Sequence, residues 1–269
     1  GIGDNVDFQG LLSDSGGVKV GRLAYELPVA YTPARLSVAY ARVGYGLGGD
    51  LAQYGAHGTA RVFETNLTYP LIRSRSRTLM ARVGAESKSL SDKLDAYDLT
   101  TDKRVVAGLA GLTYESRDSV LGGGFNSASA QLHWGQLQLK DATSAADDAA
   151  LGDYNTAGHF GRVELQYSRL QGISREVSLY VNASQQLASR NLDAAEKMTL
   201  GGPKGVRAYS SAEGASDEAS LVTSELRYWI DRNWTVFALY DWGKGRHSGF
   251  VLTLMSEIGV MAIFALSFN

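Results

Sequence analysis

The sequence predicts an all-β protein, a transmembrane antiparallel β-barrel, from three observations. Many segments alternate between apolar and polar residues with a period of two, as a strand with two different faces requires. The connections between these segments alternate between short and long, which is typical of barrels with tight turns at one end and long loops at the other. The chain also has 31 glycines among its 269 residues, too many for a typical helical enzyme.

About thirteen segments carry this alternation. From Phe63 to Leu71, for example, one face is mostly apolar or aromatic, and the other carries Glu64, Asn66 and Thr68. Further clear segments are 36–41, 79–88, 127–134, 162–167 and 177–184. Several apolar faces end in aromatic residues, namely Tyr25, Tyr69, Trp134, Trp242 and Phe268. Strands of a soluble sandwich also alternate, but charged groups in mid-strand and terminal aromatic residues favour a barrel with lipid outside and a wet lumen inside.

The connections support the same fold. Short connections are expected near Thr32, Ser74, Gly172 and Arg232, and longer ones at 46–57, 89–103, 141–157 and 187–219. In outer-membrane barrels the short turns lie in the periplasm and the long loops lie outside the cell. The pattern therefore gives the expected barrel an orientation.

Composition excludes several other classes of protein. The longest apolar stretch, residues 259–268, is about half the length that a membrane-spanning helix needs. The net charge of −2 gives no field that would attract nucleic acid, and the chain has no cysteine for a thiol nucleophile or a zinc–thiolate site. We expect no nucleic-acid partner and no cofactor.

An ordered set of motifs lies in the last third of the chain. The first reads L-G-G-P-K-G-V-R-A-Y from Leu200 to Tyr209, and Asp217 and the segment 225–228 follow it. The second reads L-Y-D-W-G from Leu239 to Gly243. Together they resemble the signature of two-partner secretion transporters, the TpsB family. The residues that carry the resemblance are Gly201, Gly202, Val206, Arg207, Ala208, Tyr209, Leu239, Asp241 and Gly243.

The resemblance implies a fold and a function. The family has a sixteen-stranded barrel in the bacterial outer membrane and exports one large, unfolded partner protein. On this basis residues 1–269 are the C-terminal barrel, and the first two strands, the periplasmic POTRA domains and the plug helix precede Gly1. The segment 187–219 becomes a long loop that folds into the lumen, where Arg207 contacts Asp241 on the inner wall.

The residues give a separate reason to pair Arg207 with Asp241. If Trp234, Ala238 and Tyr240 face lipid, strand alternation turns Asp241 towards the lumen, where a carboxylate needs a cation. An arginine on a loop of small residues can reach such a carboxylate and bind it with two parallel hydrogen bonds. The two positions are therefore expected to be in contact.

The match to the family departs at two positions. Ala208 and Ser216 stand where the family has glycine. Since glycine eases a positive φ or a close approach of the backbone, the loop tip is expected to have a slightly different shape.

The last part of the chain does not fit the expected strand count. Only four segments follow the long loop, where five are expected, and the join from Met255 to Ile258 is too abrupt for a continuous sequence, so residues are expected to be missing there. An open barrel edge in lipid would leave unpaired backbone groups, so the chain is expected to be an incomplete record of the folding unit.

Other motifs do not point to an enzyme. Residues 13–17 (S-D-S-G-G) are interpreted as a hairpin turn, because a serine nucleophile also needs a positioned base. Residues 201–205 lack the ending of a phosphate loop, and the four histidines lack the spacing of metal ligands. The prediction is a monomeric, lipid-embedded exporter. A passive porin and a barrel that inserts other barrels remain the alternatives.

Overall fold

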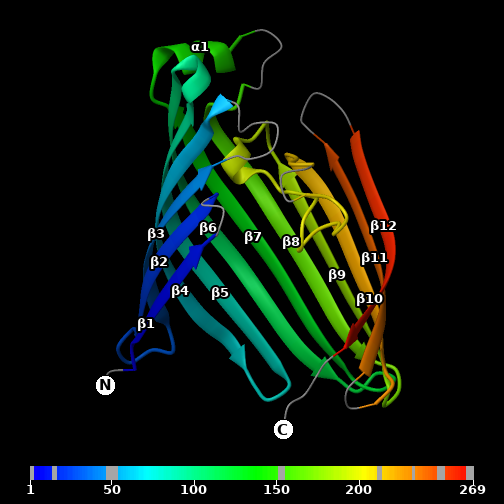
Figure 1. Cartoon of the computed structure of the whole chain (residues 1–269). Helices are drawn as coiled ribbons and strands as arrows, with labels where there is room; N and C mark the ends of the chain where they lie inside the picture. Colours follow the sequence, from blue (N-terminus) through cyan, green and yellow to red (C-terminus); the bar gives the residue numbers. More distant parts are fainter. Residues whose placement is uncertain are drawn as a thin grey trace. The chain divides into compact units, whose positions relative to one another are not determined.

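The computed structural model describes residues 3–13, 17–46, 54–150, 155–210, 214–231 and 234–246, and the backbone of 252–264. Within these residues, twelve strands form one sheet, in which each strand lies next to its neighbours in the sequence. The order can be followed by colour from β1 to β12 in Figure 1. The all-β fold class is therefore confirmed, as an antiparallel meander.

The strands are longest in the middle of the chain. Their bounds are β1 (Asn5–Leu12), β2 (Val18–Pro28), β3 (Arg35–Gly46), β4 (Ala56–Arg73), β5 (Arg77–Leu94), β6 (Leu99–Asp118), β7 (Gly124–Leu139), β8 (Gly158–Gly172), β9 (Val177–Ala188), β10 (Glu218–Trp229), β11 (Trp234–Arg246) and β12 (Leu252–Phe264). One short α-helix, α1 (Ala142–Asp148), and the 3₁₀ turns η2 (Asp95–Tyr97) and η3 (Ala194–Glu196) lie in the connections. No helix of the described chain is long and apolar enough to cross a membrane.

Each of the clearest alternating segments lies within one strand, but the predicted number of segments was too high. Three strands follow the long loop within the described residues, not four, because residues 252–264 form one strand. Through Met255–Ile258, β12 pairs with β11 without interruption, with Glu257 opposite Asp241, and the absence of residues near Met255 stays a prediction. A polar Ser-Glu pair does not end a strand that is held by a continuous ladder of backbone hydrogen bonds.

Within the described residues, the predicted alternation of connections holds with one exception; most of the connection predicted at 46–57, and Arg232 in a predicted turn, lie outside them. Short turns follow β2, β4, β6, β8 and β10, whereas residues 140–157 and 189–217 form long connections. The long loop predicted at 89–103 is wrong, because β5 continues to Leu94 and β6 begins at Leu99. In these residues both strand faces carry polar side chains, so the apolar–polar alternation stops although the strands continue.

The chain divides into two compact units, each with contributions from several strands. The first comprises residues 1–70, 81–110 and 133–161, and the second comprises 71–80, 111–132 and 162–269. In the first unit, Asn66 is buried and accepts a hydrogen bond from Arg82 Nε at 2.9 Å. Gly84 lies beside it, where a Cβ atom would lie 2.3 Å from Asn66 Oδ1.

The second unit contains the loop between β9 and β10, and its strands have two distinct faces. In β11, Leu239, Asp241, Gly243 and Gly245 are buried, whereas Tyr240 on the opposite face is exposed. We call the face that carries Asp241 the polar face and the opposite face the apolar face. By strand alternation the apolar face carries the exposed side chains of Leu165, Tyr167, Leu226, Tyr228, Trp234 and Tyr240.

Candidate functional site: the loop between β9 and β10

The tip of the β9–β10 loop, residues 200–210, is a compact turn closed by its own backbone. The amide of Val206 donates to the carbonyl of Leu200 at 2.7 Å, and the amide of Gly202 donates to the carbonyl of Tyr209 at 2.9 Å. A second short bond joins the Gly205 amide to the Gly202 carbonyl at 2.9 Å. Hydrogen bonds within its own backbone therefore define the shape of the tip, in addition to the contacts of its side chains with the sheet.

The glycines predicted as part of the motif are required by this turn. Gly202 has a φ of +97°, a conformation that residues with a Cβ atom rarely adopt. A Cβ atom on Gly201 would lie 2.1 Å from the carbonyl oxygen of Ser210, and one on Gly205 would lie 2.1 Å from that of Leu200. Backbone atoms cannot move aside as the end of a flexible side chain can, so larger residues would open the turn.

An apolar contact fixes the tip on the sheet. Leu200 and Val206 are fully buried and pack with Ala219 and Leu221 of β10. On β11, Gly243 leaves room for them, because a Cβ atom there would lie 3.1 Å from Val206 Cγ2. The motif residues Val206 and Gly243, which are far apart in the sequence, are thus two sides of one contact.

Arg207 extends from the tip to the polar face of the sheet. Its Nε donates to Asp241 Oδ2 and its Nη2 to Asp241 Oδ1, both at 2.8 Å, and its Nη1 donates to Glu225 Oε1 at 2.7 Å. The backbone amide of Arg207 also donates to Asp241, at 3.2 Å. The Asp241 side chain is fully buried, whereas that of Arg207 is 27% exposed. The structure thus places together the two residues that the sequence pairs.

Glu225 is a second acceptor that the sequence analysis quoted in a motif but did not assign to Arg207. It also accepts two hydrogen bonds from Arg227, at 3.1 Å and 2.6 Å. Antiparallel register places Glu225 directly opposite Leu239, which is buried on the same face as Asp241. Strand alternation together with this register was a signal that could have identified Glu225.

The electrostatics of the site keep the loop arginine charged. The hydrogen bond with Asp241 raises the pKa of Arg207 above its ordinary value, although partial burial opposes this effect. Two carboxylates therefore face two guanidinium groups, those of Arg207 and Arg227. The bidentate pair with Asp241 fixes the direction of the arginine as well as its charge.

The two departures from the family pattern have different consequences. Ala208 is exposed at the tip and is not among the described residues with positive φ, so a glycine is not needed there. Ser216 is buried, and its hydroxyl donates to the Gly214 carbonyl at 3.1 Å. It packs against Gly245 of β11, where a Cβ atom would lie 2.1 Å from Ser216 Oγ. The extra side chain at position 216 is thus accommodated by a glycine on the neighbouring strand.

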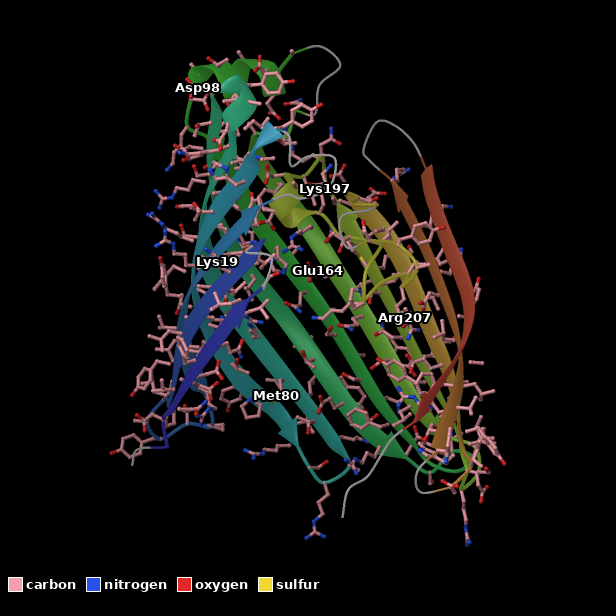
Figure 2. The ribbon with its side chains drawn as sticks, viewed as in Figure 1. Lys19, Met80, Asp98, Glu164, Lys197 and Arg207 are labelled. Carbon is pink, nitrogen blue, oxygen red and sulfur yellow. The ribbon has the colours of Figure 1, made fainter. Side chains whose placement is uncertain are left out.

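The loop root, residues 189–198 and 214–217, has buried polar contacts of its own. Asp217 is fully buried, accepts the backbone amide of Leu192 at 2.8 Å and forms an ion pair of 3.4 Å with Lys197. The amides of Met198 and Ser216 donate to each other's carbonyl groups at 3.0 Å and 2.9 Å. Arg207 and Lys197 are labelled in Figure 2, on the segment drawn in yellow.

Side chains from β8 and β9 also contact the loop root. Glu196 is buried and lies 3.0 Å from the Nε atom of Arg162 on β8. Gln186 on β9 donates to the carbonyl groups of Glu196 and Asp217, at 3.2 Å and 3.1 Å. Sequence reasoning did not find these contacts, because the root has no periodic pattern that would show which side chains are buried.

Beside the loop, the polar face lines a cavity of about 590 Å³. Its walls include Gln166, Asn182 and Ser184 from the strands and Lys204 and Arg207 from the loop tip. Gln166 Nε2 donates to Asn182 Oδ1 at 3.1 Å across β8 and β9. The cavity therefore offers hydrogen-bonding groups alongside apolar residues such as Met198 and Leu221.

Two motifs considered for other chemistry are also placed by the structure. Residues 13 and 17 of the S-D-S-G-G segment lie between β1 and β2, and 14–16 lie outside the described residues. Within the described part of the chain, no group of three or more His, Asp or Glu is placed to hold a metal ion. His247 lies outside that part.

Comparison with known proteins gives one consistent family. The profile of the haemolysin secretion/activation protein ShlB/FhaC/HecB family matches residues 12–250. The heme/hemopexin transporter protein HuxB of Haemophilus influenzae is 23% identical over 251 residues, which cover 92% of this chain and 44% of HuxB. The chain thus spans less than half the length of this curated relative.

Solved structures have the same fold. CdiB from Escherichia coli matches with a TM-score of 0.73 and 16% identity, over 98% of this chain and 51% of CdiB. CdiB from Acinetobacter baumannii matches with a TM-score of 0.65 and 16% identity, over 96% and 46%. With the family profile covering most of its length, the chain belongs to the ShlB/FhaC/HecB family, the two-partner secretion (TpsB) transporters of the Gram-negative outer membrane.

Proposed function

We propose that this chain is the membrane-spanning part of a transporter that secretes one large, unfolded partner protein. The exported chain passes along the polar face, and the β9–β10 loop sets the conformation of the passage. The observation that carries this proposal is the contact of Arg207 with Asp241 and Glu225, next to a polar cavity. A loop that is attached by a few side chains can move without unfolding the sheet.

Similarity to relatives supports export of a specific protein. The name of HuxB describes a heme/hemopexin transporter, and the family name refers to haemolysin secretion. By analogy, the partner of this chain is a large TpsA-like exoprotein, usually encoded nearby. Family members are transporters and not enzymes. Export therefore needs no bond chemistry, and folding of the partner at the cell surface provides the drive.

The apolar face is proposed to contact lipid. Its exposed residues include Leu226, Tyr228 and Tyr240, each at least 40% exposed. Exposure of such a face to water would be unfavourable. In a membrane, its aliphatic residues contact the hydrocarbon of the lipids and its aromatic residues lie at the interface with water. A closed barrel buries its sheet edges within itself, which supports a monomer as the transporting unit.

Secretion by cells that carry Arg207→Ala tests the proposal. The neighbouring exoprotein is measured in the medium, and heat-modifiable gel mobility reports whether the barrel has formed. We expect export to fall while the barrel persists, because the loop loses its attachment. Unchanged export would contradict a role for the loop contact and would favour a generic pore. A decrease of many outer-membrane proteins on depletion would instead indicate a barrel insertase.

A further inference from the structure

The short-turn end of the second unit has a groove whose chemistry differs from that of the rest of the polar face. The groove has a volume of about 710 Å³, and its walls include Arg117, Phe125, Leu170, Ser178 and Trp229. These residues come from the ends of β6, β8 and β10 and the beginnings of β7 and β9. They therefore gather at the turns that follow β6, β8 and β10.

Strand alternation places these apolar residues on the polar face. Trp229 lies two residues beyond Arg227 and four beyond Glu225 on β10, so all three share one face. Leu170 is likewise an even number of residues from Arg162, which contacts the loop root. Phe125 faces Arg117, whose guanidinium carbon lies 5.8 Å from the ring centroid.

The groove is open and apolar in a place where a water-filled passage should be polar. Phe125, Leu170 and Trp229 are 36%, 40% and 38% exposed. Further along the same face, the cavity at the loop has serine, asparagine, glutamine and charged side chains together with Tyr180, Met198 and Leu221. Apolar side chains that are exposed together in one groove indicate an interaction surface, whereas single exposed apolar residues are common on any surface.

Polar groups also belong to the wall of the groove. Ser178 is 5% exposed, and its Oγ atom has no hydrogen-bond partner among the described residues. Buried hydroxyl groups nearly always have a partner, so Ser178 leaves one hydrogen-bonding group of this wall unused among the described residues. The accessible part of the wall combines flat apolar faces with the guanidinium group of Arg117 and the carboxylate of Asp118, which suit the side chains and the amides of a peptide.

The position of the groove indicates which ligand occupies it. Short turns of outer-membrane barrels lie in the periplasm, so the groove is at the end where an exported chain enters. Trp229 and Glu225 are four residues apart on β10, about 13 Å, so an extended segment of about four residues spans from the groove to the loop contact. Between them, Arg227 stacks on Tyr180, with its guanidinium carbon 5.7 Å from the ring centroid.

We propose that this groove is a docking site for an extended segment of the exported polypeptide as it enters the passage. Stacking on aromatic rings and on arginine is tolerant of sequence, because it uses faces and not hydrogen-bond donors at fixed positions. Such a site binds many successive segments of one chain weakly and does not stop its movement. The proposal rests on the export function and names the part of the wall that the substrate contacts first.

Single-cysteine crosslinking in the full-length transporter tests the site. These 269 residues contain no cysteine, so Phe125→Cys and Trp229→Cys each place one thiol in this part of the protein. The partner exoprotein carries one cysteine and a folded fusion domain that stalls it in transit. The matched control is Tyr228→Cys, because Tyr228 is the neighbour of Trp229, is 49% exposed and lies on the apolar face.

We expect a disulfide adduct between the partner and the groove cysteines, with a yield several-fold above that of Tyr228→Cys. Equal yields from both faces, in cells that still stall the partner, would overturn the docking site and leave the export function intact. A crosslink from the groove to another segment of the transporter itself would also overturn it. If the parent transporter exports no partner at all, the failure is that of the proposed function.

A second measurement separates binding from structure. The double variant Phe125→Ser/Trp229→Ser should lower export several-fold, and Phe125→Tyr/Trp229→Phe should restore it, with normal heat-modifiable mobility in both. Normal export by the serine variant would contradict the proposal, because a wall without aromatic faces should hold the incoming chain less well.

Discussion

Replacement of Arg207 by alanine is expected to release the loop tip from the sheet. The guanidinium group donates three hydrogen bonds, and without them the buried carboxylate of Asp241 keeps only the backbone amide at 3.2 Å. Removal of one member of a buried ion pair costs about 3–5 kcal/mol, and the 27% exposure of the arginine puts the value near the lower end, about 3 kcal/mol. This corresponds to an increase on the order of a hundredfold in the undocked fraction of the tip.

Cleavage by a lysine-specific protease measures this release. Lys204 is exposed at the tip, but the next peptide lies in a closed turn, where the Gly205 amide donates to the Gly202 carbonyl at 2.9 Å. A protease needs an extended segment, so cleavage after Lys204 follows the undocked population when opening is fast. The purified transporter in detergent is digested over time, and fragments are identified by mass.

Arg227→Ala is the matched control for this experiment. Arg227 donates two hydrogen bonds to the same Glu225, but it belongs to β10 and not to the loop. We expect cleavage after Lys204 to accelerate strongly in the Arg207 variant and to stay near the wild-type rate in the Arg227 variant. Equal rates in all three proteins would refute the argument that the Arg207 contacts hold the tip.

Three further predictions concern the root and an outer connection. Gly245→Ala should undock the loop and accelerate cleavage, because its Cβ atom would lie 2.1 Å from Ser216 Oγ. Adding Ser216→Gly should reverse most of the effect, and the remainder comes from Leu200 Cδ1, which would lie 2.9 Å away. Asp217→Asn should lower the temperature at which heat-modifiable mobility changes, because this buried carboxylate holds a lysine and a loop amide. In α1, the hydrogen bond from the Ser144 amide lowers the pKa of Asp141, whose side chain caps the helix. The cap therefore stabilises the helix fully at pH values above the ordinary pKa of a carboxyl group. This stabilisation is lost as the pH falls through the lowered pKa of Asp141. Asp141→Ala should increase proteolysis of this connection at neutral pH and have no effect in strong acid, measured with an acid-active protease.

Strand positions could be predicted from the sequence because most strands have two different environments. Residues 63–71 alternate clearly, and they lie within β4. The same rule fails where both environments are aqueous. Residues 89–94 and 99–103 continue as strands, but neither face is apolar there, so the sequence has no period to detect. The incorrect prediction of a loop at 89–103 therefore concerns where two strands end and leaves the fold class unchanged.

The contact of Arg207 with Asp241 could be anticipated because one partner lies on a strand. Alternation along β11 assigns Asp241 to a face, and a buried carboxylate needs a cation. Glu225 could have been assigned by the same reasoning, since the register of β10 and β11 places it opposite Leu239. Glu196 and Asp217 could not, because Glu196 ends the short 3₁₀ turn η3 and Asp217 lies in a bend before β10, where no period along the sequence gives the direction of a side chain.

The distribution of contacts along the loop argues that its tip moves before its root. At the root, Asp217 and Glu196 are almost completely buried and bind backbone amides or side chains that are themselves buried. At the tip, the Arg207 guanidinium remains partly exposed, so water can replace its bonds one at a time. Local opening follows the least protected contacts. The proposed function requires a loop that clears the passage and then returns to the same place, and a root that stays bound during release of the tip would provide that return.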